Sequence, residues 1–401
     1  MADARHEQTE AKEWSAQPLL DWLFSEGRLI ESDPEFVLQF SRRLSSCCAP
    51  VERVLVTILT LNPEIVATSS SWLKSTDRID YFEAERHVRE TDRYIGSPLQ
   101  SLFETEKRVR QRLDDLPGNA HSAYTELADE GFTDYLALPV MFAGGLGAAL
   151  ILSTKRKNGF SEHDIANFRV IRDYVTPTIE VHALRYLSRS LMNTYVGKRT
   201  GEKVLAGMIQ RGDADVINAA LWFSDLRDFT QMTEELPPQQ VLDLLNDYFA
   251  FVSAAVTARG GEVLRFIGDA MLIVFPIGKN MCQQTACNAA LDSAIDAQDT
   301  IASLNHRRRR RGLPQIQFGV GLNVGEVIYG NVGAPDRLDF TVMGPAVNRT
   351  ARLEALTKEF DCNILFSEQF ASSVATPSEY LGIREMKGIA EPQAVYALCR
   401  T

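Results

Sequence analysis

Two aspartates in the second half of the sequence stand at positions where carboxylates could bind metal ions. Asp225 follows the apolar run 219–223, so we expect it at the carboxyl end of a strand. Asp269 lies in a Gly-Asp turn between the expected strands 262–267 and 271–275, which together predict a hairpin. Such a pair can hold divalent cations such as Mg²⁺, whose remaining ligands are substrate phosphates and water. The alternative is that Asp269 serves only the geometry of its turn.

An amide and a guanidinium form a second candidate group. Gly344 and Pro345 begin an expected helix that extends through Phe360, because proline is favoured in the first turn of a helix. Asn348 and Arg352 are four residues apart on that helix. Residues at this spacing share one face, so the two side chains can reach one target together.

The elements expected to position these residues alternate between strands and helices around an antiparallel sheet. The helix 238–259 has one apolar face and ends at Gly260-Gly261. In chain order the expected elements are a strand at 219–223, a helix at 238–259, strands at 262–267 and 271–275, a strand from 316 whose pattern continues through 333 into 339–343, a helix at 345–360, and strands at 362–366 and 394–398.

Five segments of this half resemble, in order and in separation, the motifs of class III adenylate or guanylate cyclase catalytic domains. They are FSDLRDFT (223–230), RFIGDAM (265–271), GLNVGEVIYGNVG (321–333), TVMGPAVNRTARLE (341–354) and MKGIAEP (386–392). The resemblance covers roughly residues 215 to 400, nearly half of the chain. It implies a ferredoxin-like α/β (α+β) domain that works as a head-to-tail homodimer, with active sites built from both chains.

The resemblance assigns the polar residues to a two-metal reaction on a nucleoside triphosphate, in which the ribose 3′-hydroxyl attacks the α-phosphate and pyrophosphate leaves. Asp225 and Asp269 would hold two Mg²⁺ or Mn²⁺ ions from one subunit. Asn348 and Arg352 would come from the other subunit. There Asn348 would orient the ribose, and Arg352 would stabilise the charge that develops at the α-phosphate.

The resemblance also bears on substrate binding. Lys387 matches a lysine that reaches the terminal phosphates, and the backbone amides near Phe229 and Thr230, where a helix begins, would add an anion site. Arg265 and Thr341 stand at the two positions that choose the base, where adenylate cyclases usually have Lys and either Asp or Thr. The Thr fits a subgroup that is often bicarbonate-responsive. Arginine only donates hydrogen bonds, which suits N1 of adenine but equally O6 of guanine. Because the acidic residue typical of guanylate cyclases is absent, we expect ATP.

The first half of the chain resembles a GAF domain, a small sensory α/β module. The resemblance rests on element order: a helix at 34–48, strands at 51–61 and 65–70, a charged stretch of loops and short helices at 76–113, a hairpin at 135–141 and 147–153, and a helix beginning at Ser161. Ser161 and Asp164 form an acidic variant of the capping box. GAF-like domains often hold a small ligand, yet many only dimerise or transmit, and no motif identifies a ligand here.

A helix that runs past Pro177 to Val196 is expected to connect the two halves, followed by a linker at 197–203. Four side chains near its end recur at the spacing of a two-helix seam, Leu184, Leu187, Leu191 and Tyr195. The alternative is that this stripe packs on its own domain. The expected domains are a flexible N-terminus at 1–16, a GAF-like regulatory domain at 17–183, a signalling helix and linker at 184–212, and a cyclase catalytic domain at 213–401.

The composition limits the classes of function. The chain has 401 residues, 45% of them apolar and 24% charged, which is typical of a folded protein. Its net charge of −11 argues against broad nucleic-acid binding, and we expect the arginine run 307–311 to lie in a solvated loop. No membrane span is evident, and the polar N-terminus lacks the apolar core of a signal peptide, so we expect a cytoplasmic protein. Six cysteines without CxxC spacing favour reduced, structural thiols over a zinc site or a disulfide framework.

Together these features predict an adenylate cyclase that makes 3′,5′-cyclic AMP and pyrophosphate at a homodimer interface. Regulation would come from the N-terminal domain, through a small molecule or bicarbonate. A guanylate cyclase is the nearest alternative. A catalytically silent sensory or dimerisation protein is the alternative from a different class, but every motif position for the metals and the transition state is filled.

Overall fold

The computed structural model of the chain describes residues 14–279 and 281–398. Most of the expected flexible N-terminus and Cys399 therefore lie outside the described residues. The chain divides between Leu191 and Met192 into two compact units, which are described separately below.

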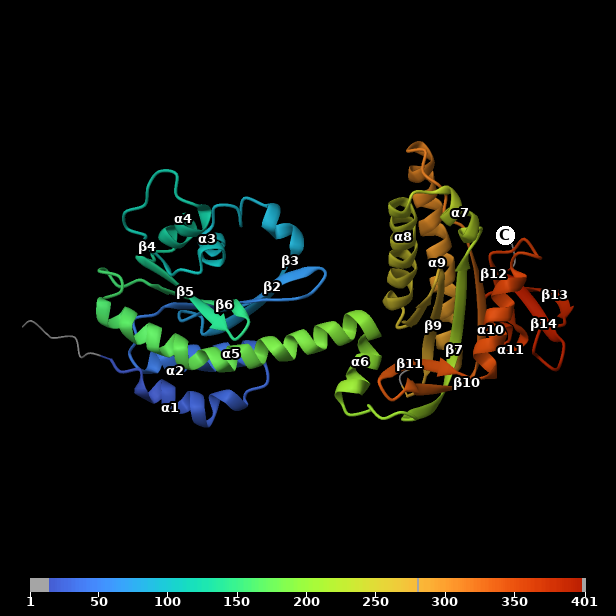
Figure 1. The fold of residues 1–401 in the computed structure, drawn as a ribbon, viewed down its shortest axis with the longest axis horizontal. Helices are drawn as coiled ribbons and strands as arrows, with labels where there is room; N and C mark the ends of the chain where they lie inside the picture. The colour runs from blue at the N-terminus through green and yellow to red at the C-terminus, as the bar shows by residue number, and fades with distance from the viewer. Residues whose placement is uncertain (1–13, 280, 399–401) are drawn as a thin grey trace, which may run out of the picture. The chain divides into compact units, whose positions relative to one another are not determined.

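The first unit is built on a six-stranded antiparallel sheet with the order β3-β2-β1-β6-β5-β4 (Figure 1). Its elements are α1 (Gln17–Ser25), η1 (Gly27–Leu29), α2 (Asp33–Ser46), β1 (Arg53–Leu59), β2 (Ile65–Leu73), β3 (Arg78–Glu85), η2 (Arg86–Glu90), α3 (Pro98–Thr105), β4 (Val109–Arg112), α4 (Ser122–Asp129), β5 (Asp134–Phe142), β6 (Gly145–Thr154) and α5 (Glu162–Val196).

Alternate residues of this sheet face two different layers of helices. Val54, Val56 and Ile58 of β1 lie in a core shared with α1, α2 and α5. The intervening Leu55 faces the opposite side, where it belongs to a smaller core with residues of α3 and α4. Figure 1 shows these two layers on either side of the sheet. The two-residue period of a strand therefore gives this sheet two apolar faces.

Two features of the first unit test the expectations directly. The capping box is confirmed, since the Ser161 amide donates to Asp164 Oδ2 at 2.6 Å and the Asp164 amide donates to Ser161 Oγ at 3.2 Å. The expectation of only loops and short helices at 76–113 is wrong, because β3 and β4 lie there. β3 is an edge strand with mostly exposed, charged side chains, so its sequence lacks the apolar alternation that predicts a strand.

The second unit is an α+β domain with an eight-stranded sheet in the order β13-β14-β12-β10-β7-β9-β8, to which β11 adds by pairing with β10. The β10 and β12 pair is parallel. The elements are α6 (Lys198–Leu205), β7 (Ala214–Leu226), α7 (Phe229–Glu235), α8 (Pro238–Ala258), β8 (Glu262–Ile267), β9 (Ala270–Ile277), α9 (Gln283–Arg310), β10 (Phe318–Ala334), β11 (Arg337–Met343), α10 (Pro345–Leu356), β12 (Ile364–Ser367), α11 (Glu368–Ala371), β13 (Ser378–Arg384) and β14 (Gln393–Leu398).

The faces of this sheet are also separated by alternation along its central strand. Ala220 and Trp222 of β7 are buried with residues of α8 and α9. Ala219 and Leu221 lie on the other face, together with Ala346 of α10. In Figure 1, α8 and α9 lie on one side of β7 and α10 lies on the other.

Helix α8 is, among the described residues, the one helix long and apolar enough by length and composition to cross a membrane. Four of its side chains are buried in the core of the second unit, Leu244, Tyr248, Val252 and Val256.

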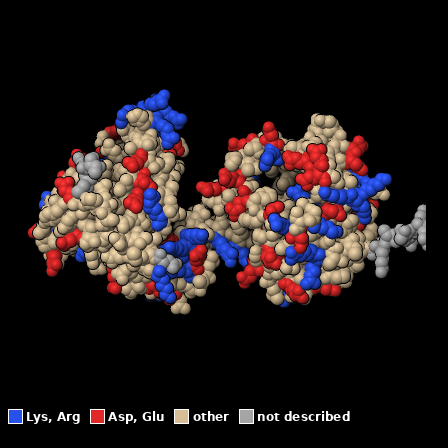
Figure 2. All heavy atoms as spheres, turned by 180° about the vertical axis from the view of Figure 1, so that it is seen from behind, with Lys and Arg blue, Asp and Glu red and all other residues tan. Residues whose placement is uncertain are grey.

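Two charged segments of the second unit differ from expectation. The stretch expected as a linker forms α6, in which the buried Thr200 donates its amide to Glu262 Oε1 at 3.2 Å. The arginine run ends α9 rather than lying in a loop, and there it is a basic cluster at one end of the unit (Figure 2). Arg308 is buried, since it donates to the Pro314 carbonyl at 2.7 Å and pairs with Asp247.

The described cysteines are free thiols that differ in exposure. Cys287 is buried in α9, Cys47 and Cys362 are half-buried, and Cys48 and Cys282 are exposed.

Candidate active site

The two aspartates expected to bind metal lie together at one end of the sheet. Asp225 is the penultimate residue of β7, and Asp269 lies in the turn between β8 and β9. Because Ser224 pairs with Met271, that turn is next to the end of β7. Burial, and then a hydrogen bond and repulsion between the two carboxyls, raise the pKa of Asp269 to about 6. The chain therefore holds two half-buried carboxyl groups in contact with each other.

The donor set fits a hard divalent cation. Two adjacent carboxylates repel each other when both are ionised, and a cation between them relieves this repulsion. Within 14–279 and 281–398, no group of three or more His, Cys, Asp or Glu side chains is arranged so that it could hold one metal ion. The protein offers two carboxylates, and Mg²⁺ commonly completes such a site with water and substrate phosphates.

A third acidic residue, Glu354 of α10, lies behind this pair and was not expected from the sequence. Gly319 of β10 is paired with Asp225, and a Cβ atom at Gly319 would lie 2.8 Å from Glu354 Oε1. Glu354 is 5% exposed, and its Oε1 has no hydrogen-bond partner among the described residues. Burial, followed by repulsion from Asp225, raises the pKa of Glu354 to about 7. Gly319 and Gly321 of β10, which both lie against Glu354, are the sequence signal for this close approach of helix and strand.

Asn348 and Arg352 lie on the opposite side of α10 from Glu354. Both are exposed, whereas Ala346, Thr350 and Glu354 face the sheet and are buried. No hydrogen bond or ion pair joins Asn348 or Arg352 to either aspartate in the described part of the chain. One chain therefore brings the two carboxylates together but points the amide and the guanidinium elsewhere.

The loop before β14 lies next to this exposed side of α10. Arg352 Nε donates to the Lys387 carbonyl at 3.2 Å, which ties the loop to the helix. A pocket of about 410 Å³ next to this contact is lined by Asn348, Gly388 and Gln393 among others. Asn348, Arg352 and the backbone of Lys387 are thus neighbours, and the Lys387 side chain is exposed.

The two residues expected to choose the base lie on neighbouring strands. Arg265 is on β8, Thr341 is on β11, and the two strands contact each other. Arg265 forms an ion pair with Asp339, which was not expected from the sequence. The sequence does contain a hint that Asp339 lies near these residues. It stands two residues before Thr341, and residues two apart in a strand lie on the same face.

The helix start after Asp225 is short and is not capped by a side chain. Asp228 occupies the N-cap position with a positive φ of 58°, and its side chain makes no capping hydrogen bond. Phe229 is half-buried and packs against the main core, while Thr230 is exposed. Phe229 therefore packs in the core. Of these two residues, only Thr230 has a side chain that a ligand could contact.

Comparisons with known proteins concern the second unit. Residues 214–398 match the family described as the adenylate and guanylate cyclase catalytic domain. An adenylate cyclase of Anabaena cylindrica is 35% identical over 176 residues, which are 43% of this chain and 34% of that protein. The terminal-differentiation specific adenylate cyclase of Dictyostelium discoideum is 33% identical over 190 residues, 46% of this chain and 9% of that protein.

Among solved structures, the adenylyl cyclase CyaB from P. aeruginosa is 27% identical, with a TM-score of 0.43, and the match covers 47% of this chain and 96% of that one. The chain spans about a third or less of the length of the two curated relatives above, 34% and 9%.

Proposed function

Residues 214–398 belong to the adenylate and guanylate cyclase catalytic domain family, as the motifs predicted, and from this premise we propose that the chain is an adenylate cyclase. It would convert ATP to 3′,5′-cyclic AMP and pyrophosphate. The observation that carries the proposal is the placement of Asp225 at the end of β7 beside the turn that holds Asp269, combined with the exposure of Asn348 and Arg352 on the far side of α10.

Asp225 and Asp269 would hold two Mg²⁺ or Mn²⁺ ions. When bound there, the cations would lower the pKa of the ribose 3′-hydroxyl and neutralise the negative charge of the triphosphate. The aspartate pair would also fix the position of the substrate through its phosphates, because both carboxylates belong to strands and a tight turn rather than to a long loop.

The remaining residues would act on the substrate directly. The 3′-hydroxyl would lose its proton to water as its oxygen forms a bond to the α-phosphorus, the bond from that phosphorus to the bridging oxygen would break, and pyrophosphate would leave with the negative charge. Arg352 would donate hydrogen bonds to the α-phosphate as charge develops there. Asn348 would orient the ribose, and Lys387 would hold the terminal phosphates.

The active site would be shared by two copies of the chain. Asn348 and Arg352 point away from the sheet that carries the aspartates of their own chain. A second copy that places its aspartates against this exposed face would complete the site. Each dimer would then contain two sites, each with its aspartates from one chain and its Asn348 and Arg352 from the other.

The base would be read by Arg265 and Thr341. Arginine donates to an acceptor on the base, while threonine can donate or accept. Guanylate cyclase activity is the second candidate, because the guanidinium of Arg265 can donate to O6 of guanine as well as to N1 of adenine.

The N-terminal half would regulate the reaction. We assign a GAF-like regulatory domain to 17–183, a signalling helix and linker to 184–212 and the catalytic domain to 213–401. A shared site gives regulation a physical route, since a small rotation of the connecting helix could assemble or separate its two halves. A small molecule or bicarbonate would be the effector.

The test is an assay of the purified full chain with Mg²⁺ or Mn²⁺ and either ATP or GTP. We expect cyclic AMP from ATP, with a higher kcat/KM than for GTP. A preference for GTP would support the second candidate and overturn the assignment of the base. If a folded, dimeric sample formed neither cyclic nucleotide, the proposal that the chain is a nucleotide cyclase would be overturned.

A further inference from the structure

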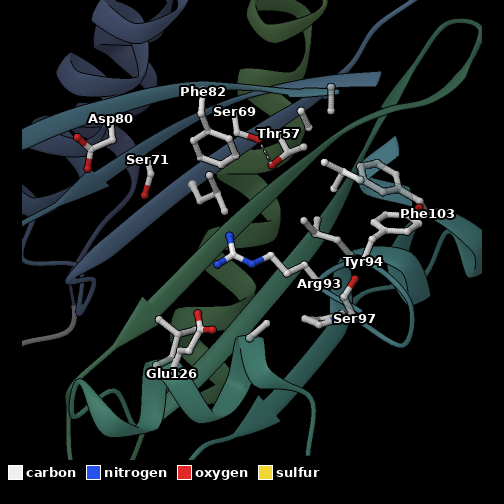
Figure 3. Close-up of a pocket in the computed structure, with 18 of the residues that line it drawn as sticks. Thr57, Ser69, Ser71, Asp80, Phe82, Arg93, Tyr94, Ser97, Phe103 and Glu126 are labelled. Carbon is white, nitrogen blue, oxygen red and sulfur yellow. Dashed lines mark hydrogen bonds between the residues drawn. The ribbon is translucent and has the colours of Figure 1, made fainter. Parts of the chain in front are cut away.

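The first unit contains a cavity of about 440 Å³ that the proposed reaction does not use. It lies between the sheet face formed by β1, β2 and β3 and the segments that carry η2, α3 and α4 (Figure 3). Its volume is that of about 15 water molecules in the liquid, and it falls within the range of small-molecule sites. The cavity is therefore large enough for a ligand with one or two rings.

The floor of the cavity is a regular patch of the sheet. Thr57 of β1 pairs with Ser69 of β2, and Ser69 pairs with Phe82 of β3, so the three side chains form one row across the sheet. Thr57 Oγ1 and Ser69 Oγ share a hydrogen bond of 3.0 Å, and both residues are 3% exposed. Each hydroxyl keeps further hydrogen-bonding capacity for a ligand, since a hydroxyl has one donor and two acceptor sites.

Apolar and aromatic side chains make up much of the remaining lining. They include Leu55, Tyr94, Leu99, Phe103, Leu127 and Tyr135. Tyr135 and Leu55 are buried, whereas Tyr94, Leu99 and Phe103 are half-buried. This composition favours a ligand with a planar or branched apolar body.

Arg93 supplies the specific polar group. In Figure 3 its side chain extends into the middle of the cavity, between the strands that carry Thr57 and Ser69 and the helix that carries Glu126. Its guanidinium makes no hydrogen bond or ion pair within the described part of the chain. Arg53, another arginine of the lining, instead donates from Nε to Ser71 Oγ at 3.4 Å. Arg93 is thus an exposed residue whose guanidinium extends into a mostly apolar cavity and makes no hydrogen bond to the described part of the chain.

Acidic residues limit how many negative charges a ligand can carry. Asp80, Glu126 and Glu130 also line the cavity, and Figure 3 shows Asp80 and Glu126 at different ends of it. Three arginines, Arg53, Arg89 and Arg93, also line the cavity, so its charges balance and a ligand with a single negative charge at Arg93 is favoured. A planar carboxylate matches the planar fork of a guanidinium in two parallel hydrogen bonds.

We propose that this cavity binds a small organic carboxylate with an aromatic or branched apolar body, held by Arg93 at its charged end and by the Thr57 and Ser69 row at its floor. This inference does not depend on the cyclase reaction, because every residue in it lies in the first unit.

The test compares two probes of equal shape on the purified full chain by isothermal titration calorimetry, 1-naphthaleneacetate and its neutral analogue 1-naphthaleneacetamide. Loss of a charge-assisted bidentate contact typically weakens binding about tenfold or more, so the carboxylate should bind at least that much more tightly than the amide. Arg93→Met should remove this preference. Arg108→Met, which changes an exposed arginine outside the lining, should keep it.

A second variant keeps the inference testable if Arg93→Met unfolds, which the thermal unfolding profile would reveal. Ala84→Trp adds a ring to the cavity from the edge strand β3 and should abolish binding of both probes. Equal binding of the carboxylate and the amide would overturn the proposal. Unchanged preference in a folded Arg93→Met variant, or no binding of either probe to the unaltered chain, would overturn it as well.

Discussion

The ion pair between Arg265 and Asp339 would determine how Arg265 contacts the base in the proposed site. Both side chains are about half exposed, at 49% and 42%, so the pair faces solvent where a ligand can reach it. The Asp339 carboxylate holds the guanidinium in one orientation and occupies part of its donors. An arginine without this partner could turn to donate to either purine.

We therefore predict that Asp339→Ala lowers selectivity between ATP and GTP more than it lowers activity. Loss of one hydrogen bond to a charged group changes an equilibrium constant by about tenfold or more. The ratio of kcat/KM for ATP to kcat/KM for GTP should therefore fall by about this factor. The matched control is Asp336→Ala, in the turn before β11, which should leave the ratio unchanged. An Asp339→Ala variant with the original ratio would contradict the role of the pair.

Glu354 makes the stability of the protein depend on pH. Its carboxyl has a pKa of about 7 in the folded chain against an ordinary value of 4.5. The folded state therefore binds the proton more tightly than the unfolded state, and the free energy of unfolding falls as pH rises between these values. Below about pH 4.5 the carboxyl is neutral in both the folded and the unfolded state, so it does not lower the free energy of unfolding.

We predict that Glu354→Gln removes this decrease in the free energy of unfolding at high pH. With a shift of this size the difference at pH 8 is on the order of 3 kcal/mol, so the variant should be more stable than the unaltered chain at pH 8 and similar at pH 5. Urea midpoints measured in EDTA at both pH values test this, with Glu359→Gln as an exposed control. A variant that gains nothing at pH 8 would show that Glu354 is paired or solvated in solution.

At the scale of elements, α5 carries an exposed face longer than the stripe read from the sequence. The residues of this face recur along α5 at alternating intervals of four and three positions, and all of them are exposed. They are Val170, Tyr174, Pro177, Val181, Leu184, Ser188, Leu191 and Tyr195. Leu187, which was expected in the stripe, is half-buried and lies beside this face. Glu180 and Arg185 flank the face, at positions where they would meet across a parallel, in-register pair of helices.

We predict that this face pairs two copies of the chain in parallel. Leu184→Glu combined with Leu191→Glu places two charges per chain in the seam and should weaken the dimer at least about 100-fold. Sedimentation equilibrium measures the change, and Arg189→Glu, on the exposed side away from the seam, is the control. A double variant that stays dimeric at the same concentration would place the dimer contact elsewhere.

Helix α6 connects the end of α5 to the strand that leads to the active site. Glu262, the first residue of β8, accepts hydrogen bonds from the Thr200 amide and from Tyr329, the latter at 3.3 Å. The same strand carries Arg265 and ends next to Asp269. A displacement of α6 would therefore act on the hairpin that holds the proposed base and metal contacts, through buried polar bonds that are costly to break.

At the scale of the molecule, the sequence predicted most of the second unit because its chemistry lies in contiguous motifs. Asp225 and Asp269 could be placed at a strand end and a turn from local patterns alone. Asp339 and Glu354 could not, since their roles depend on which strand or helix packs beside them. The same limit explains the missed edge strands β3 and β13, which have no buried side chain, and Arg308, whose burial depends on Asp247 of another helix.

The final prediction concerns the proposed division of the site between two chains. Asp225→Ala and Arg352→Ala chains should each be inactive as homodimers, because every site lacks one half. In a mixture, half of the dimers combine the two variants at random, and each of these contains one site with neither change. Cyclic AMP formation should therefore recover to about a quarter of the unaltered rate.

A mixture of Asp225→Ala with Asp269→Ala is the matched control, since both changes lie in the same half of the site. Whichever chain supplies the aspartates, one of them is missing, so this mixture should stay inactive. Recovery in the first mixture and not in the second can arise only if the aspartates act together from one chain while Arg352 acts from the other. No recovery in either mixture, with mixed dimers demonstrated by two affinity tags, would mean that each chain carries a complete site.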